Sequence, residues 1–365
     1  MSEAPFILWL DDPTAAGNPL LGGKFANLGE MTAAGFAVPP GFGITTAAYR
    51  YFLRSAGLQD EVRRVREAAP GLQLSDIKRE TAVLLAGITN APLPADLESL
   101  IRTHYARFEE RVGVTNVPVA VRSSGESEDL AGASFAGQYE TFLWITGADA
   151  LLAHVRACWA GMFGEAVLSY RQDGDTVISK GDFAICVGVQ LMVSARAAGV
   201  LFTLDPINGD RSKMVLEACW GLGEGVVKGD ITPSRFTVDK VTLEILKRQV
   251  TPQTEEYRFD PAAAIVRLAP IEAERQHAVC VSDDHVRALA TLAKRIEAAR
   301  GAPQDIEWAV SHRGDVWVLQ VRPETVWSRR EQTALVTAPK SPVAHVLTRL
   351  SGVRVTKPSA APEKP

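Results

Sequence analysis

Four polar side chains near the end of the chain have the types that bind a metal ion and phosphate. They lie in two alternating runs, 304–310 (QDIEWAV) and 316–322 (VWVLQVR). The intervening segment, 311–315 (SHRGD), has an Arg-Gly centre, which predicts a hairpin with the two-residue turn Arg313-Gly314. The two runs are therefore predicted to pair as antiparallel strands.

The predicted turn fixes which of the four polar residues face one another. Glu307 is expected opposite Gln320, and Asp305 opposite Arg322. Side chains alternate between the faces of a strand, so all four would share one face. Two carboxylates, an amide oxygen and a guanidinium on one face suit Mg²⁺ that carries a polyphosphate. An exposed hairpin with a cross-strand salt bridge is the alternative that this pattern leaves open.

Two further segments have features of a phosphate site. In 119–142 (VAVRSSGESEDLAGASFAGQYETF), a short apolar strand leads into Arg122 and then into a run rich in Ser and Gly. Small residues let backbone N–H groups approach an anion, and Arg offers a planar fork to its oxygens. Near the N-terminus, Gly22 and Gly23 precede Lys24 at the start of a predicted helix. A mobile polar loop and an ordinary surface turn are the respective alternatives.

Composition limits the class of protein. The chain has 365 residues, and 39 Lys and Arg against 43 Asp and Glu give a net charge of −4, which argues against nucleic acid or a membrane surface as a partner. No apolar run is long enough to span a bilayer, and the N-terminus lacks the basic region and the small-residue cleavage site of a leader. The cysteines are widely spaced and are predicted to be reduced core residues of a cytoplasmic protein. They are Cys158, Cys186, Cys219 and Cys280.

The elements that would position these residues divide the chain into two lobes and a tail. Helical spacing predicts helices over 24–35, 45–56, 60–69, 75–85, 97–112 and 149–163, and one from Ser282 to Gly301. Apolar or alternating runs predict strands over 183–193, 199–204, 213–219, 235–239 and 243–250. We therefore expect a helix-rich lobe at 1–185, a strand-rich lobe at 186–327 and a flexible tail at 328–365. Within the first of these strands, Gln190 and Met192 would line an adenine slot or lie in the core. A cleft between lobes commonly holds a nucleotide.

Several motifs, in order, resemble the nucleotide-binding domain of the phosphoenolpyruvate synthase family. They are GGKFANLGEM, VRSSGESEDLAGASFAGQYETF, GVLFTLDPINGD, WGLGEGVVKGD, and DIEWAV followed by VLQVRPETV. They extend from residue 20 to residue 327. The resemblance implies an α+β, ATP-grasp fold, in which two lobes clamp ATP.

The resemblance also implies roles for individual residues. Lys24, Arg122 and Arg322 would contact phosphates and act in catalysis. Glu307 and Gln320 would ligate Mg²⁺, with Asp305 close by. Gln190, Met192 and Glu217 would lie near the adenosine. Members of the family cleave ATP to AMP and phosphate and leave one phosphoryl group on a histidine of a mobile domain.

The sequence departs from the family in one respect. No Gly-Gly-x-Thr-Ser-His type segment, which carries that histidine in the family, is present. This predicts an ATP-binding subunit that phosphorylates a histidine on a partner subunit in a hetero-oligomer, while the partner binds the small-molecule acceptor. The resemblance is to the ATP-binding subunit of phenylphosphate synthase, with phenol as acceptor. The alternatives are the ATP-binding part of a phosphoenolpyruvate synthase or of an antibiotic phosphotransferase of the rifampicin type, or a regulatory subunit that senses ATP without chemistry.

Overall fold

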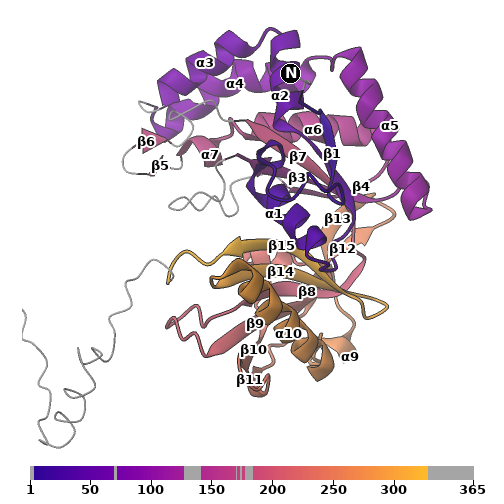
Figure 1. The fold of residues 1–365 in the computed structure, drawn as a ribbon, viewed down its shortest axis with the longest axis vertical. Helices are drawn as coiled ribbons and strands as arrows, with labels where there is room; N and C mark the ends of the chain where they lie inside the picture. The colour runs from indigo at the N-terminus through magenta and orange to yellow at the C-terminus, as the bar shows by residue number, and fades with distance from the viewer. Residues whose placement is uncertain are drawn as a thin grey trace, which may run out of the picture. The chain divides into compact units, whose positions relative to one another are not determined.

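A computed structural model of the chain describes residues 4–69, 72–126, 141–169, 171–172, 175–176 and 184–327 (Figure 1). The predicted tail, 328–365, lies outside these residues, as does 127–140 in the Ser- and Gly-rich segment. The described residues form two lobes, each built on an antiparallel sheet with helices packed on it. The α+β class expected from the sequence is confirmed.

Five strands form the sheet of the first lobe, in the order β1-β2-β7-β3-β4. Strand β7 pairs with both β2 and β3, so this sheet continues to Leu191, beyond the lobe boundary that the sequence places at residue 185. Because β7 is central and covered on both faces, its sequence is a nearly continuous apolar run, with Gln190 as the exception, rather than an alternating one. The strands are β1 (Ile7–Trp9), β2 (Gly41–Ile44), β3 (Val119–Gly125), β4 (Thr141–Ile145) and β7 (Ile185–Leu191).

Helices cover both faces of this sheet. On one face α1 packs so closely that a Cβ added to Gly188 of β7 would come within 1.8 Å of the Phe25 ring. On the other face Val187 and Val189 join the core beneath α2, α4, α5 and α6. The helices are α1 (Gly22–Ala33), α2 (Thr46–Ser55), α3 (Gln59–Ala68), α4 (Leu74–Asn90), α5 (Ala95–Val112), α6 (Ala148–Gly161) and α7 (Glu165–Ser169), with a 3-10 turn at Pro19–Leu21 and a short strand pair, β5 (Arg171–Gln172) and β6 (Asp175–Thr176).

Every helix predicted in this lobe is present, and the largest difference is in α4. The sequence predicts its end at residue 85, whereas the helix continues to Asn90. Leu84 and Ile88, one turn apart, are both fully buried, so packing extends the helix beyond the part with clear apolar spacing.

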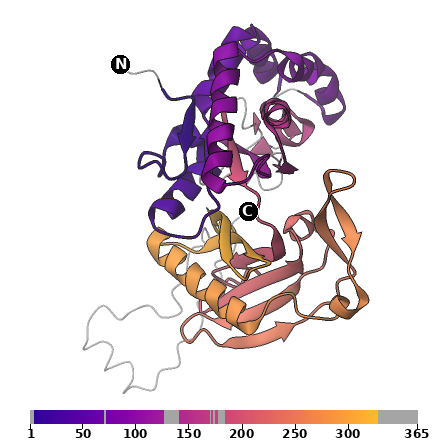
Figure 2. The same cartoon turned by 90° about the vertical axis from the view of Figure 1, so that its right-hand side faces the viewer.

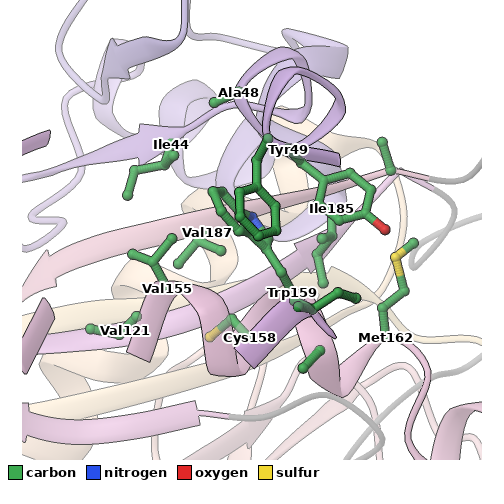
Figure 3. Packing of buried hydrophobic residues seen from close by; sticks show 14 of the residues in the cluster. Ile44, Ala48, Tyr49, Val121, Val155, Cys158, Trp159, Met162, Ile185 and Val187 are labelled. Atoms are coloured by element: carbon green, nitrogen blue, oxygen red, sulfur yellow. The ribbon is translucent and has the colours of Figure 1, made fainter. Parts of the chain in front are cut away.

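Trp159 of α6 lies at the centre of the larger core of the first lobe (Figure 3). It is completely buried and stacks on Phe52 of α2, with ring centroids 4.8 Å apart. Trp159→Ala would leave a large cavity, so we expect it to lower the free energy of unfolding by about 3–5 kcal/mol. Chemical denaturation followed by circular dichroism measures this loss. As a control in the same lobe, Val83→Ala removes a side chain that is 69% exposed and should change stability by less than about 0.5 kcal/mol.

Six strands form the sheet of the second lobe, in the order β11-β10-β9-β8-β14-β15. Helix α10 packs along one face of it (Figure 2). The predicted caps of α10 are confirmed: the Ser282 side chain accepts from the His285 N–H, and Gly301 ends the helix with φ of +69°. The elements are β8 (Ala195–Phe202), β9 (Lys213–Trp220), α8 (Glu224–Lys228), β10 (Ser234–Asp239), β11 (Ile245–Gln249), α9 (Ala273–Gln276), α10 (Asp283–Arg300), β14 (Gln304–Ser311) and β15 (Val316–Pro323), with a separate hairpin of β12 (Glu255–Asp260) and β13 (Ile265–Pro270).

The four cysteines lie in the core. All four cysteines are buried, as predicted for core residues, and none of them forms a disulfide. Burial raises the pKa of the Cys219 and Cys280 thiols to about 12, so neither is a ready nucleophile. Among the described residues, no helix has both the length and the apolar character needed to cross a bilayer.

Candidate functional site

The C-terminal hairpin has the predicted pairing of its four polar residues but a different turn. Glu307 lies opposite Gln320 and Asp305 opposite Arg322. The predicted two-residue turn is wrong: Ser311 and Asp315 close a longer turn, in which Gly314 adopts φ of +93°. A β-bulge between Glu307 and Trp308 shifts the register by one and compensates for the extra turn residue.

The four polar residues share the face of the sheet that points away from α10. Neighbouring β14 and β15 residues on the opposite face, including Ile306, Trp308 and Val321, are buried in the core with α10. Strand β14 also pairs with β8, and β8 with β9, so the face continues from Glu307 across Val200 to Glu217. The side chains of Asp305, Glu307, Gln320 and Arg322 therefore form a polar surface on β14 and β15. The apolar core with α10 lies on the opposite face of the same strands.

Asp305 and Arg322 form a tight ion pair on this face. The Arg322 guanidinium lies 2.6 Å from Oδ2 of Asp305, whose side chain is only 10% exposed. Burial raises the pKa of the Asp305 carboxyl, an effect that Arg322 only partly offsets. Oδ1 of Asp305 is buried and has no hydrogen-bond partner among the described residues. This oxygen can therefore accept a hydrogen bond or bind a cation.

Arg122 of β3 extends from the first lobe to the hairpin. Its guanidinium donates to Oε2 of Glu307 at 3.1 Å, to Oε1 of Gln320 at 2.9 Å and to the Leu319 carbonyl at 2.9 Å. Leu319 is the residue that the bulge leaves without a cross-strand partner, which exposes its carbonyl to Arg122. Arg122 thus contacts three residues that lie 185 or more positions further along the chain.

Lys24 lies in the first turn of α1, the helix that packs against both β3 and β15. The Asn27 side chain of this helix donates to the Val321 carbonyl at 3.4 Å. The start of the helix is fixed from β3, where the Ser124 hydroxyl accepts the Phe25 N–H at 3.1 Å. The structure therefore brings the element carrying Lys24 to the strands that carry Arg122 and Gln320.

The three residues expected near adenosine have different surroundings. Gln190 is 2% exposed, and its amide donates to the Pro39 carbonyl at 3.3 Å, in the first sheet. Met192 packs in an apolar cluster with Leu319, next to the bulge. Glu217 forms an ion pair with Arg235 at 2.8 Å, on the same face as Glu307. Met192 and Glu217 thus border the polar surface, whereas Gln190 has the contacts of a structural residue.

Sequence reasoning missed two residues at this site. The Leu319 carbonyl becomes an acceptor only because of the bulge, which no local signal announces. Ser124 was inside the segment singled out for its small residues, but no role was given to it. Strand alternation offered a signal, since residues two apart on β3 share a face and Ser124 must therefore lie beside Arg122.

The donors on the polar face fit Mg²⁺. Within the part of the chain that the structure describes, no three His, Cys, Asp or Glu side chains are placed to hold a metal ion. The face instead carries the carboxylates of Glu307 and Asp305 and the amide oxygen of Gln320. Mg²⁺ commonly takes one or two carboxylates and completes its shell with phosphate oxygens and water. Oδ1 of Asp305, which is buried and has no hydrogen-bond partner among the described residues, is a further oxygen ligand that this face could offer to Mg²⁺.

The guanidinium of Arg122 from one lobe meets oxygen donors of the other lobe, as in a domain that binds a phosphate-bearing nucleotide. The model of the family "Pyruvate phosphate dikinase, AMP/ATP-binding domain" matches residues 18–341. The chain belongs to this family, and the family resemblance inferred from its motifs is confirmed. The match and the two mixed lobes together confirm the α+β, ATP-grasp fold class.

Curated relatives are named phosphoenolpyruvate synthase. The protein from Aeropyrum pernix is 36% identical over 382 residues, which covers 95% of this chain and 46% of the relative. That from Aquifex aeolicus is 35% identical over 348 residues, covering 90% of this chain and 40% of the relative. The chain thus spans less than half the length of these relatives. A solved structure of D-alanyl-alanine synthetase A from Vibrio cholerae aligns with 63% of this chain and 56% of its own at 13% identity, but its TM-score of 0.23 is too low to bear on the fold.

Proposed function

We propose that this chain is the ATP-binding part of a phosphoenolpyruvate synthase-type dikinase. Its family membership and the names of its relatives favour this reading over the phenylphosphate synthase subunit expected first from the sequence, for which the comparisons give no support. The observation that carries the proposal is the contact of Arg122 with both Glu307 and Gln320. It supports the proposal because Arg122, which we propose binds phosphate, lies against oxygen donors of the kind that Mg²⁺ prefers.

Each residue of the polar surface has a proposed role. Glu307 and Gln320 would hold Mg²⁺, with Asp305 as a nearby donor, and the metal would offset the charge of the phosphates when bound. Lys24, Arg122 and Arg322 would hold phosphate oxygens and stabilise the charge that develops as the group transfers. Phosphoryl transfer rests on positioning and electrostatic stabilisation, so no general base within this chain is required.

Arg122 must change partners when the metal and nucleotide bind. Its guanidinium uses the Glu307 and Gln320 oxygens that Mg²⁺ would need. The phosphates of ATP carry more negative charge than the Glu307 carboxylate, so their oxygens are alternative acceptors for the Arg122 guanidinium. We therefore propose that Glu307 and Gln320 would hold the metal when it is bound, and that Arg122 would then release these two oxygens and contact the phosphates.

The acceptor of the phosphoryl group is proposed to be a histidine outside the described residues, on a further domain or on a partner subunit. ATP, one water molecule and the histidine would give AMP, phosphate and phosphohistidine. The histidine nitrogen would form a bond to the β-phosphorus while the bond between that phosphorus and the oxygen retained by AMP breaks. Water would then attack the γ-phosphorus, and the bond from that phosphorus to the bridging oxygen would break, which releases phosphate and leaves phosphohistidine. The histidine-bearing domain would then pass the group to a small-molecule acceptor.

The test combines the protein, Mg²⁺ and ATP labelled in its β- and γ-phosphates with candidate histidine-bearing proteins. We expect AMP release together with acid-labile label on the partner. Transfer of that label to pyruvate would support the phosphoenolpyruvate synthase-type reading, whereas transfer to phenol would support the phenylphosphate one. Tight ATP binding without AMP or labelled histidine, across all partners, would overturn the dikinase proposal in favour of an ATP-sensing subunit.

A further inference from the structure

Ser124 joins the two elements that carry the proposed phosphate-binding cations. Its hydroxyl donates to the Leu21 carbonyl at 2.8 Å and accepts the Phe25 N–H at 3.1 Å. Leu21 lies just before α1 and Phe25 in its first turn, so both bonds grip the segment that contains Lys24. The serine is completely buried, where an unmade hydrogen bond costs more than at the surface.

The backbone of β3 touches the same segment directly. Gly22, the first residue of α1, adopts φ of +64°, and a Cβ placed there would lie 2.2 Å from the Ser124 carbonyl oxygen. Only glycine fits this approach, for reasons of both backbone conformation and space. The start of α1 therefore has little freedom to shift along β3.

Strand geometry connects this grip to Arg122. Arg122 and Ser124 are two residues apart on β3 and point to the same face, towards α1. The intervening Ser123 points to the opposite face, where its neighbours Val121 and Val187 belong to the core of the first lobe. One strand thus holds Arg122 and anchors the helix turn that carries Lys24.

We propose that Ser124 is a positioning residue for phosphoryl transfer, holding Lys24 at a fixed place relative to Arg122. The proposal rests on the proposed function, because it assigns both cations to the phosphates of ATP. Ser124 itself does not touch the nucleotide in this scheme. Loss of its hydroxyl would leave the Leu21 carbonyl and the Phe25 N–H without this partner and let the first turn of α1 move. A shift of about 1 Å in a charged contact can lower a rate by about 10²-fold.

The neighbouring serine supplies a matched control. Ser123 is 1% exposed, on the same strand and of the same size, but its hydroxyl has no hydrogen-bond partner among the described residues. Ser123→Ala and Ser124→Ala therefore remove the same atom from equally buried positions. They differ in whether that atom holds the start of α1.

The experiment measures AMP formation and, by calorimetry, the affinities for ATP and for adenosine. For Ser124→Ala we expect AMP formation to fall by about 10- to 100-fold and ATP to bind about tenfold more weakly, with adenosine affinity unchanged. Ser123→Ala should resemble the wild type in all three. The phosphate-specific loss is the decisive readout, because general destabilisation would weaken ATP and adenosine alike.

The affinities and rates of the two serine variants decide whether Ser124 has a positioning role. If Ser124→Ala matches Ser123→Ala, or loses ATP and adenosine affinity equally, the positioning role is wrong. Should Ser124→Ala not fold, Ser124→Cys keeps nearly the same volume with a much weaker hydrogen-bonding group and is expected to show the same selective loss to a smaller degree; wild-type affinities in that variant would overturn the proposal. If the wild-type protein forms no AMP with any partner, the proposed function is wrong. The role of Ser124 is then still tested by whether Ser124→Ala weakens the binding of ATP but not that of adenosine.

Discussion

Glu307→Ala is expected to lower Mg-ATP-dependent phosphoryl transfer by about 10²-fold or more, the usual cost of removing a preorganised charge contact. The carboxylate would be a ligand of Mg²⁺ in the proposed site, and in the structure it is the charged partner of Arg122. Its loss would remove a metal ligand and leave a partly buried guanidinium without its counter-charge. AMP formation, measured over a range of Mg²⁺ concentrations, tests this expectation.

A second ion pair in the same lobe provides the control for this substitution. Glu297 of α10 pairs with Lys240 at 2.9 Å, with side chains 21% and 15% exposed, close to the 22% and 13% of Glu307 and Arg122. Glu297→Ala therefore breaks an equally buried ion pair outside the polar surface. We expect transfer within about twofold of the wild type. Equal losses in the two variants would show that Glu307 acts through stability and not through the site.

Arg122→Ala is expected to have an effect of similar size, about 10²-fold on phosphoryl transfer. Its guanidinium contacts Glu307, Gln320 and the Leu319 carbonyl at once, so the alanine variant loses both a proposed phosphate ligand and a contact between the lobes. Arg122→Lys should restore little, because an ammonium group on a flexible stem cannot reproduce a planar fork with several partners. Single-turnover rates and ATP affinity separate loss of chemistry from loss of binding.

The matched control for Arg122→Ala is Lys240→Ala, which removes the cation of the comparison ion pair. It should leave the transfer rate nearly unchanged. Wild-type turnover by Arg122→Ala, assayed with a competent histidine-bearing partner, would remove Arg122 from the site. Full rescue by lysine would mean that only its charge matters and that the fork geometry does not.

Alternation along two short runs was enough to predict the hairpin face. Because side chains alternate strictly, one correct pair determines which residues share a surface, and the Glu307–Gln320 and Asp305–Arg322 pairs were found. The predicted turn was nevertheless wrong, and the pairing was right because the bulge beside Glu307 offset the longer turn. Bulges arise from the fit of a whole strand to its neighbours, so the local sequence does not specify them.

The boundary between the two lobes is a second feature that the local sequence does not specify. The buried strand predicted over 183–193 is present as β7, Ile185–Leu191, yet its place in the first sheet depends on pairing with β2 and β3, which are distant in sequence. Periodicity reports burial, but it does not report which sheet provides the neighbours. For this reason the sequence ends the first lobe at 185, whereas its sheet extends to Leu191.

The sequence by itself determined the family, the α+β class, the seven longer helices among the described residues and the four polar residues of the hairpin face; the short helices α7, α8 and α9 were not predicted. These depend on residue type, short-range spacing and turn chemistry, which are local properties of the chain. Only the tertiary structure decided that Arg122 meets Glu307 and Gln320, that a bulge offers it the Leu319 carbonyl, and that Ser124 holds the start of α1. These contacts join residues about 100 to 200 positions apart, and they exist because β3 packs on α1 within the first lobe and also reaches the β14–β15 hairpin of the second lobe.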